Sequence, residues 1–168
     1  MAMTELGLAN EIGGGKVRWR SIQENQKASL VTTTGPNVVA MSLSADSEWL
    51  SYGRRNSGVF VLKLKGGSGS EIALPNPNSL ISSNVNALLI HKVSNSKSMM
   101  YRVVAGDQQG TLVYWLLKYE HSTISTPQLI AKDLGCITAV TNQMEDLFVA
   151  SKDGVKVIKL DSASGGVL

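Results

Sequence analysis

The 168-residue chain has a single cysteine, few aromatic residues (5%) and no long hydrophobic run. One cysteine, Cys136, excludes an internal disulfide and a zinc site made from several cysteines. No run approaches the roughly 18 consecutive apolar residues that span a bilayer as a helix. Residues 1–5 lack the basic flank and apolar run of a secretory signal. These absences favour an intracellular, reducing compartment, either the cytoplasm or the nucleus, and predict no membrane partner.

Strong charge and helical periodicity are also missing. The net charge is +3, and the lysines and arginines are scattered, whereas a nucleic-acid-binding domain usually clusters them. No segment sustains an apolar pattern of 3.6-residue period, so helix is expected to be nearly absent. The hydrophobic fraction of 43% and the charged fraction of 17% are still those of a globular chain. The chain is therefore predicted to be all-β.

What is present is a repeated unit in which a glycine-bearing turn leads into a short apolar strand. The unit occurs at residues 15–19, 58–62, 110–115 and 154–158. A period of about 40–45 residues with several strands per unit is typical of a β-propeller blade. The sequence thus predicts a β-propeller fragment of about three to four four-stranded blades.

Alternation and turn residues divide the chain, 1–168, into four blade units of a single partial propeller. The units span approximately residues 6–33, 38–74, 85–132 and 136–168. Each is expected to contain strands a to d in chain order, with two exceptions at the ends. The first unit is expected to lack strand a, and the outer strand of the fourth falls on 166–168.

The stretch 65–70 contains mostly glycine and serine, which give flexibility without packing. It has the composition of a natural blade loop and equally of an engineered replacement for an excised insertion. Both interpretations stay open, and no function is assigned to these residues.

Two segments resemble the WD-repeat family. Residues 42–53, SLSADSEWLSYG, are similar to its F-S-P-D-G-x-x-L-A-S-G segment, and residues 105–115, AGDQQGTLVYW, to its S-G-D-x-D-G-T-x-x-x-W segment. The family's Gly-His and Trp-Asp pairs are absent, so its buried Asp–His–Ser–Trp network is not expected. The final unit, 153–168, also resembles the repeat of quinoprotein-type propellers. The WD resemblance covers about residues 9–162 and implies a propeller that acts as an interaction scaffold.

Propellers of the WD type usually close with six to eight blades, more than this chain supplies. The chain is then half of a propeller completed by another polypeptide, a truncated piece, or an unusually small closed ring. We favour completion by a partner chain or a second copy, because blades bury their faces against neighbours and unpaired strand edges recruit partners.

Catalytic patterns are scarce, and no catalytic residue, metal site or cofactor is predicted. His91 lies in an apolar run and His121 in a polar loop, and neither has a partner at metal-ligand spacing. The segment 13–16, GGGK, lacks the following helix and hydroxyl residue of a phosphate loop. Cys136 is expected to be a small buried hydrophobe, and Trp19, Trp49 and Trp115 are expected to lie in the core.

The functional face of a propeller is usually built from loops. If the family topology holds, the b–c and d–a turns share one rim, with Asn37, Asn78 and Asn84 nearby. The candidate partner-binding residues on this rim are Arg54, Arg55, Asp107, Gln108, Lys152 and Asp153. The pair Arg54-Arg55 is the sharpest local signal, because paired guanidinium groups clamp carboxylates or phosphates.

The leading hypothesis is a non-enzymatic protein-protein interaction scaffold that forms a subunit of a larger complex. One alternative is a nucleic-acid-binding propeller with a basic rim of Arg18, Arg20, Arg54 and Arg55. Another is a small-ligand or quinoprotein-like propeller, although the low aromatic content argues against stacking sites.

Overall fold

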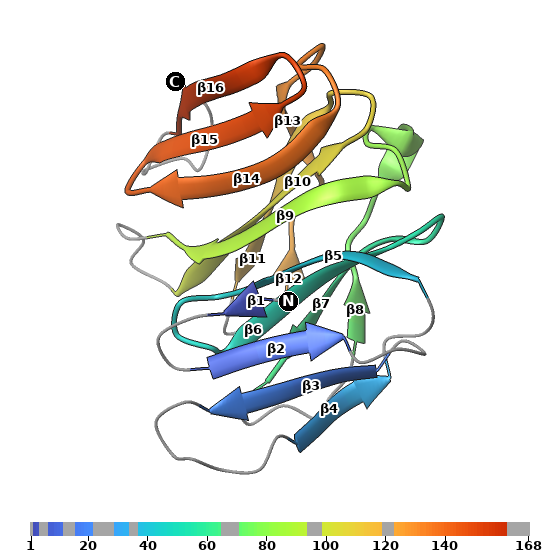
Figure 1. The fold of residues 1–168 in the computed structure, drawn as a ribbon, viewed down its shortest axis with the longest axis vertical. Coiled ribbons are helices and arrows are strands. Elements are labelled where there is room, and N and C mark those ends of the chain that lie inside the picture. Colours follow the sequence, from blue (N-terminus) through green and yellow to red (C-terminus); the bar gives the residue numbers. More distant parts are fainter. Residues whose placement is uncertain are drawn as a thin grey trace.

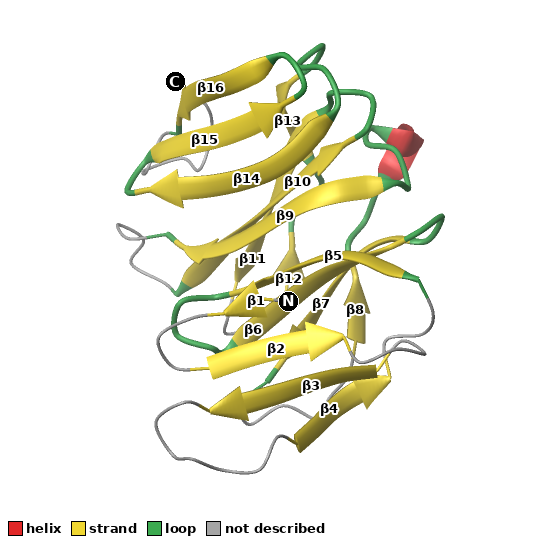
Figure 2. Cartoon of the chain, in the orientation of Figure 1, coloured by secondary structure: helices red, strands yellow, loops and turns green. Residues whose placement is uncertain are grey.

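Four antiparallel sheets follow one another along the chain in the computed structural model (Figures 1 and 2). The structure describes residues 2–3, 7–11, 16–21, 29–33, 37–64, 71–93, 99–118 and 123–160, and before residue 37 it describes the backbone alone. The expectations for residues 13–15, 65–70 and 166–168, for His121 and for the Trp19 side chain therefore fall outside the described part.

Consecutive strands pair in each sheet, except at the outer edge of the third sheet. The first sheet contains β1 (Ala2–Met3), β2 (Gly7–Glu11), β3 (Lys16–Ser21) and β4 (Ser29–Thr33). The second contains β5 (Val38–Leu43), β6 (Trp49–Arg54), β7 (Gly58–Lys63) and β8 (Glu71–Ala73). The third contains β9 (Val85–Lys92), β10 (Met100–Asp107), β11 (Leu112–Lys118), β12 (Thr123–Ile124) and β13 (Gln128–Ala131). The fourth contains β14 (Ile137–Gln143), β15 (Asp146–Ser151) and β16 (Gly154–Lys159).

The expected order of strands is confirmed, with two corrections. The first unit does have an a strand, because β1 pairs with β2 in register Ala2–Ala9 and Met3–Leu8. The outer strand of the third unit is divided, since β12 and β13 both pair with β11. Ser125 lies at the break, where its hydroxyl accepts the Leu116 N–H (2.9 Å), and Pro127 has no N–H to donate to the sheet.

Helix is almost absent from the described residues, as expected. The single short 3₁₀ turn there, η1, spans Pro77–Ser79. In this described part, no helix has the length and apolar character that crossing a membrane requires.

The sheets stack face to face, with β5, β9 and β14 as neighbouring inner strands and the first and fourth sheets at opposite ends (Figure 1). Two apolar layers fill the spaces between the later sheets. The layer between the second and third sheets includes Trp49, Val61, Ile90, Tyr101 and Trp115, all 2% exposed or less. The layer between the third and fourth includes Val104, Leu112, Ile137, Leu147 and Val149. The core expectation for Trp49 and Trp115 is thus confirmed.

Small residues allow the inner strands to approach one another. Across the first two strands of each later sheet, the register pairs Ala40 with Gly53, Ala87 with Gly106, and Ala139 with Ala150. A Cβ on Gly106 would lie 2.6 Å from Cγ2 of Ile137 in the next sheet. Side chains larger than these would hold the sheets apart and open the apolar layers to water.

Polar bonds also join the second sheet to the third. Asp46, in the β5–β6 turn, accepts hydrogen bonds from the Ser44 hydroxyl and from the Tyr101 hydroxyl of β10, both 2.7 Å. Burial raises the pKa of Asp46, but these hydrogen bonds outweigh burial and the net shift is downward. The Trp115 Nε1–H donates to the carbonyl of Pro75 at 2.8 Å. The Asp–His–Ser–Trp network of WD repeats is not expected from the sequence, yet a partly buried Asp–Ser–Tyr link joins these two sheets.

We expect Tyr101→Phe to lower the free energy of unfolding by about 1–2 kcal/mol, because Asp46 loses a charge-assisted hydrogen bond. Tyr114→Phe is the matched control, since it removes a tyrosine hydroxyl from a neighbouring strand without breaking this link. Denaturant unfolding of both variants provides the measurement. Equal destabilisation by the two substitutions would contradict the structural role of the link.

Candidate functional site

The turns between the second and third strands of the later sheets lie at one end of the blades, together with the connections between sheets. Three hydrogen bonds show this. The N–H of Arg55 donates to the carbonyl of Asn37 (2.9 Å), the N–H of Leu134 to Gly110 (3.2 Å), and the N–H of Lys152 to Cys136 (3.1 Å). The predicted sharing of a rim by the b–c and d–a turns is confirmed, and we call this end the turn rim.

Arg54 is partly buried at the turn rim, and its charge is engaged by groups of its own blade. Its guanidinium lies over the Phe60 ring, 4.3 Å from the centroid, and Nη2 bonds with the carboxylate of Glu71 on β8. The Tyr52 hydroxyl donates to the same carboxylate, and burial, followed by this hydrogen bond, raises the pKa of Tyr52. The expectation of a paired-arginine clamp is therefore wrong. Arg54 fastens the outer strand of its blade, and Arg55 alone is exposed.

Asp107 has no exposed surface and acts within the fold. Its Oδ1 accepts the backbone N–H groups of Gln109 and Thr111, both at 2.9 Å, and its Oδ2 accepts the N–H of Ser82 at 2.9 Å. These three bonds fix the β10–β11 turn and join it to the connection that precedes β9. Its proposed contact with a partner is thus corrected to a structural role.

The remaining rim candidates are exposed. They are Arg55, Gln108, Lys152 and Asp153, one or two from each turn. Gln108 Nε2 lies 3.5 Å from Asn86 Oδ1. The carboxylate of Asp153 lies over Gly135, where a Cβ would be 2.2 Å from Oδ2 and φ is +72°. The turn rim thus presents two cations, one anion and one amide on turns that are held by backbone hydrogen bonds.

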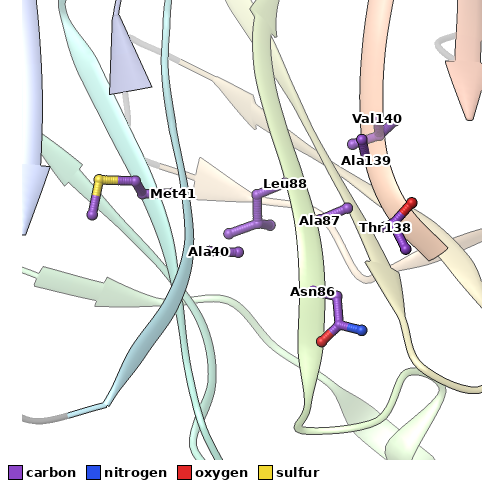
Figure 3. Close-up of a pocket in the computed structure, with 8 residues that line it drawn as sticks. All are labelled: Ala40, Met41, Asn86, Ala87, Leu88, Thr138, Ala139 and Val140. Carbon is purple, nitrogen blue, oxygen red and sulfur yellow. The ribbon is translucent and has the colours of Figure 1, made fainter. Parts of the chain in front are cut away.

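A shallow hollow of about 200 Å³ lies along the inner strands β5, β9 and β14 (Figure 3). It is lined by Ala40, Met41, Asn86, Ala87, Leu88, Thr138, Ala139 and Val140. Its volume is below the roughly 300–1,000 Å³ of typical small-molecule sites. The sequence contains an indication of this hollow that the sequence-based expectations did not include. Alanine, a small residue, recurs in the third position of all three inner strands.

Cys136 and His91 both lie close to the inner strands, and the structure changes what was expected of them. Cys136 is only partly buried, and its Sγ lies 3.7 Å from Asn86 Nδ2, so it is not a core hydrophobe. His91 lies on β9 opposite Arg102, with Nδ1 3.5 Å from Asn142 Nδ2 on β14. Its Nε2 is buried without a hydrogen-bond partner among the described atoms. Burial, and secondarily the charge of Arg102, lowers the pKa of His91 to about 4.

The described residues hold no group of three or more histidine, cysteine, aspartate or glutamate side chains placed to bind a metal ion. No protein-family model matches the chain, and no curated protein matches it either.

Solved structures do resemble it. The β-propeller domain of Cps50 (Swd1) from Myceliophteria thermophila matches 97% of this chain and 54% of its own, with 15% identity and a TM-score of 0.65. The dihydro-heme d1 dehydrogenase NirN matches 97% and 33%, with 18% identity and a TM-score of 0.63. The designed protein Ika4 matches 95% and 89%, with 20% identity and a TM-score of 0.61.

These likenesses establish the fold. The chain is a β-propeller fragment, and it spans about half the length of the Swd1 domain. Both a WD-type propeller and a quinoprotein-type propeller are among the similar structures, so neither subfamily is selected.

His91 predicts a pH dependence of stability. Its pKa falls from 6.5 in the unfolded chain to about 4 in the fold, so between these values the unfolded state alone takes up the proton. The contribution of neutral His91 to the free energy of unfolding is fully present above pH 6.5. It declines as the pH falls, by about 3 kcal/mol at pH 4. Urea unfolding between pH 7 and 4.5 tests this.

The control is His91→Gln, which removes the titrating ring and keeps a neutral polar side chain. The decline over this window should be absent in the variant. Parallel stability curves for the two proteins would show that His91 is not its source.

Proposed function

We propose that this chain is a non-enzymatic interaction scaffold, a propeller segment that forms a subunit of a larger assembly. The observation that carries the proposal is the open end of the stack. On the fourth sheet, Val155 and Val157 are 69% and 55% exposed, although they belong to an apolar sheet face of the kind that blades bury. A partner chain or a second copy completes the propeller.

The turn rim supplies the recognition surface in this proposal. Arg55, Gln108, Lys152 and Asp153 offer charges of both signs and an amide, which suits a polar protein segment of mixed charge. The likeness to the Swd1 propeller domain supports a fold of the scaffold kind. The cytoplasmic or nuclear compartment stays a prediction that depends on the cysteine content.

The dispersal of reactive groups supports the non-enzymatic part. His91 is held neutral beside Arg102, and its contact is an amide from Asn142. The nucleic-acid alternative loses Arg54, whose charge is engaged by Glu71. For the small-ligand alternative, the hollow on the inner strands is shallow and below the usual volume of a ligand site. Neither alternative is favoured.

The test compares two sets of four alanine substitutions. The rim set replaces Arg55, Gln108, Lys152 and Asp153. The control set replaces Lys92, Lys118, Gln143 and Glu145, which are exposed, lie at the opposite ends of strands and carry the same charges. Quantitative affinity purification of the chain from cell extract measures the proteins that bind.

We expect specific partners to bind the wild type and the control, and to be depleted roughly tenfold or more with the rim variant. Absence of specific partners, or equal binding by the rim variant, would exclude a scaffold that works through this rim.

A further inference from the structure

One face of the fourth sheet is left uncovered by the described chain. Strand register places six residues on it, which define the outer face of the fourth sheet: Ala139, Thr141, Phe148, Ala150, Val155 and Val157. Leu147 and Val149, which alternate with Phe148 along β15, point to the opposite face and are 0% and 1% exposed. Both faces of this sheet are therefore apolar, but only one is buried.

The outer face continues the stack. The third sheet uses the corresponding face, with Val104, Leu112 and Tyr114, to pack on the fourth sheet. The outer face of the fourth sheet is therefore equivalent to the face with which the third sheet packs on the fourth. In this stack, a face of that kind packs on the opposite face of the following blade. In Figure 1 the first sheet lies at the far end of the stack, and no other described sheet covers its side away from the second sheet.

We propose that the occupant is a second copy of this chain. The outer face of the fourth sheet packs on the first sheet of the second copy, and the reciprocal contact closes a two-fold ring of eight sheets. This inference rests on the proposed function, in which the segment is completed by another polypeptide.

The length of the chain supports this occupant. The chain spans 54% of the Swd1 propeller domain, so two copies supply about the length of that propeller. Propellers typically contain 4–8 blades, and twice four sheets lies within that range.

The area of the contact also favours a reciprocal pair. Three strands about 4.8 Å apart, each with six residues of about 3.3 Å, cover roughly 300 Å² on each side of one contact. One contact then buries roughly 600 Å² in total, below the roughly 1,200 Å² of a stable interface. A two-fold pair makes the contact twice and reaches that size, with both contacts formed in one association step.

The experiment is sedimentation equilibrium of the full chain and of two double variants. Val155→Lys with Val157→Lys places two charges on the outer face. Leu129→Lys with Met144→Lys is the matched control, because these residues are also exposed apolar side chains (44% and 87%) and lie outside that face. Circular dichroism checks that both variants fold. Folding is expected, because the replaced side chains are exposed in the single chain.

We expect twice the chain mass for the wild type and the control, and the mass of one chain for the outer-face variant. Its dissociation constant should rise at least about tenfold. A monomeric wild type, or a dimer that the outer-face variant leaves intact, would overturn the pairing.

Cross-linking between isotopically labelled and unlabelled copies tests the orientation. The head-to-tail pair predicts links between Lys152 of one copy and Lys16 of the other, since both lie next to second-to-third strand turns. Links between two fourth sheets alone would overturn it. If the pairing fails but the rim variant still loses its partners, the scaffold function stands and only the choice of occupant is wrong.

Discussion

Face-to-face burial of apolar sheet surfaces is the interaction on which the rest of this structure depends. The sheets approach closely because alanine and glycine occupy paired positions on the first two strands, as at Ala87 and Gly106. This approach brings the Ser42 hydroxyl within 3.1 Å of the Ile90 N–H and the Tyr101 hydroxyl within reach of Asp46. The polar links between blades therefore follow from the packing, and they fix the relative position of sheets that apolar contact alone would leave free to slide.

The residues of the turn rim fall into two groups: some stabilise the turns, and others are exposed to solvent. Asp107 and Arg54 are engaged by groups of the fold, while Arg55, Lys152 and Asp153 extend from the turns so fixed. Recognition side chains on turns with satisfied backbone groups lose less conformational freedom on binding than those on loose loops. In the proposed scaffold, this smaller loss of conformational freedom would favour binding at the rim.

The sequence located the strand that follows each of the four glycine turns to within three residues, because glycine turns and alternation are local signals. It missed β1, since a strand of two residues shows no alternation. The role of Arg54 was also not predictable, because Glu71 is brought beside it by the pairing of β7 with β8. Asp107 resembles any polar turn residue until Ser82 is placed against it. The errors thus concern contacts between segments distant in the chain, which composition and periodicity do not encode.

The outer strands of the second and third sheets are short and interrupted. β8 has three residues, and β12 and β13 have two and four, separated by Ser125 and Pro127. Such edges offer few consecutive backbone groups to an added strand, so they resist the edge-to-edge growth that leads to fibrous aggregates. This protection matters more for a propeller fragment than for a closed propeller, because the fragment has apolar sheet faces that no neighbouring blade covers. In the proposed pairing, the short outer strands leave association to the sheet faces, where it ends in a closed particle.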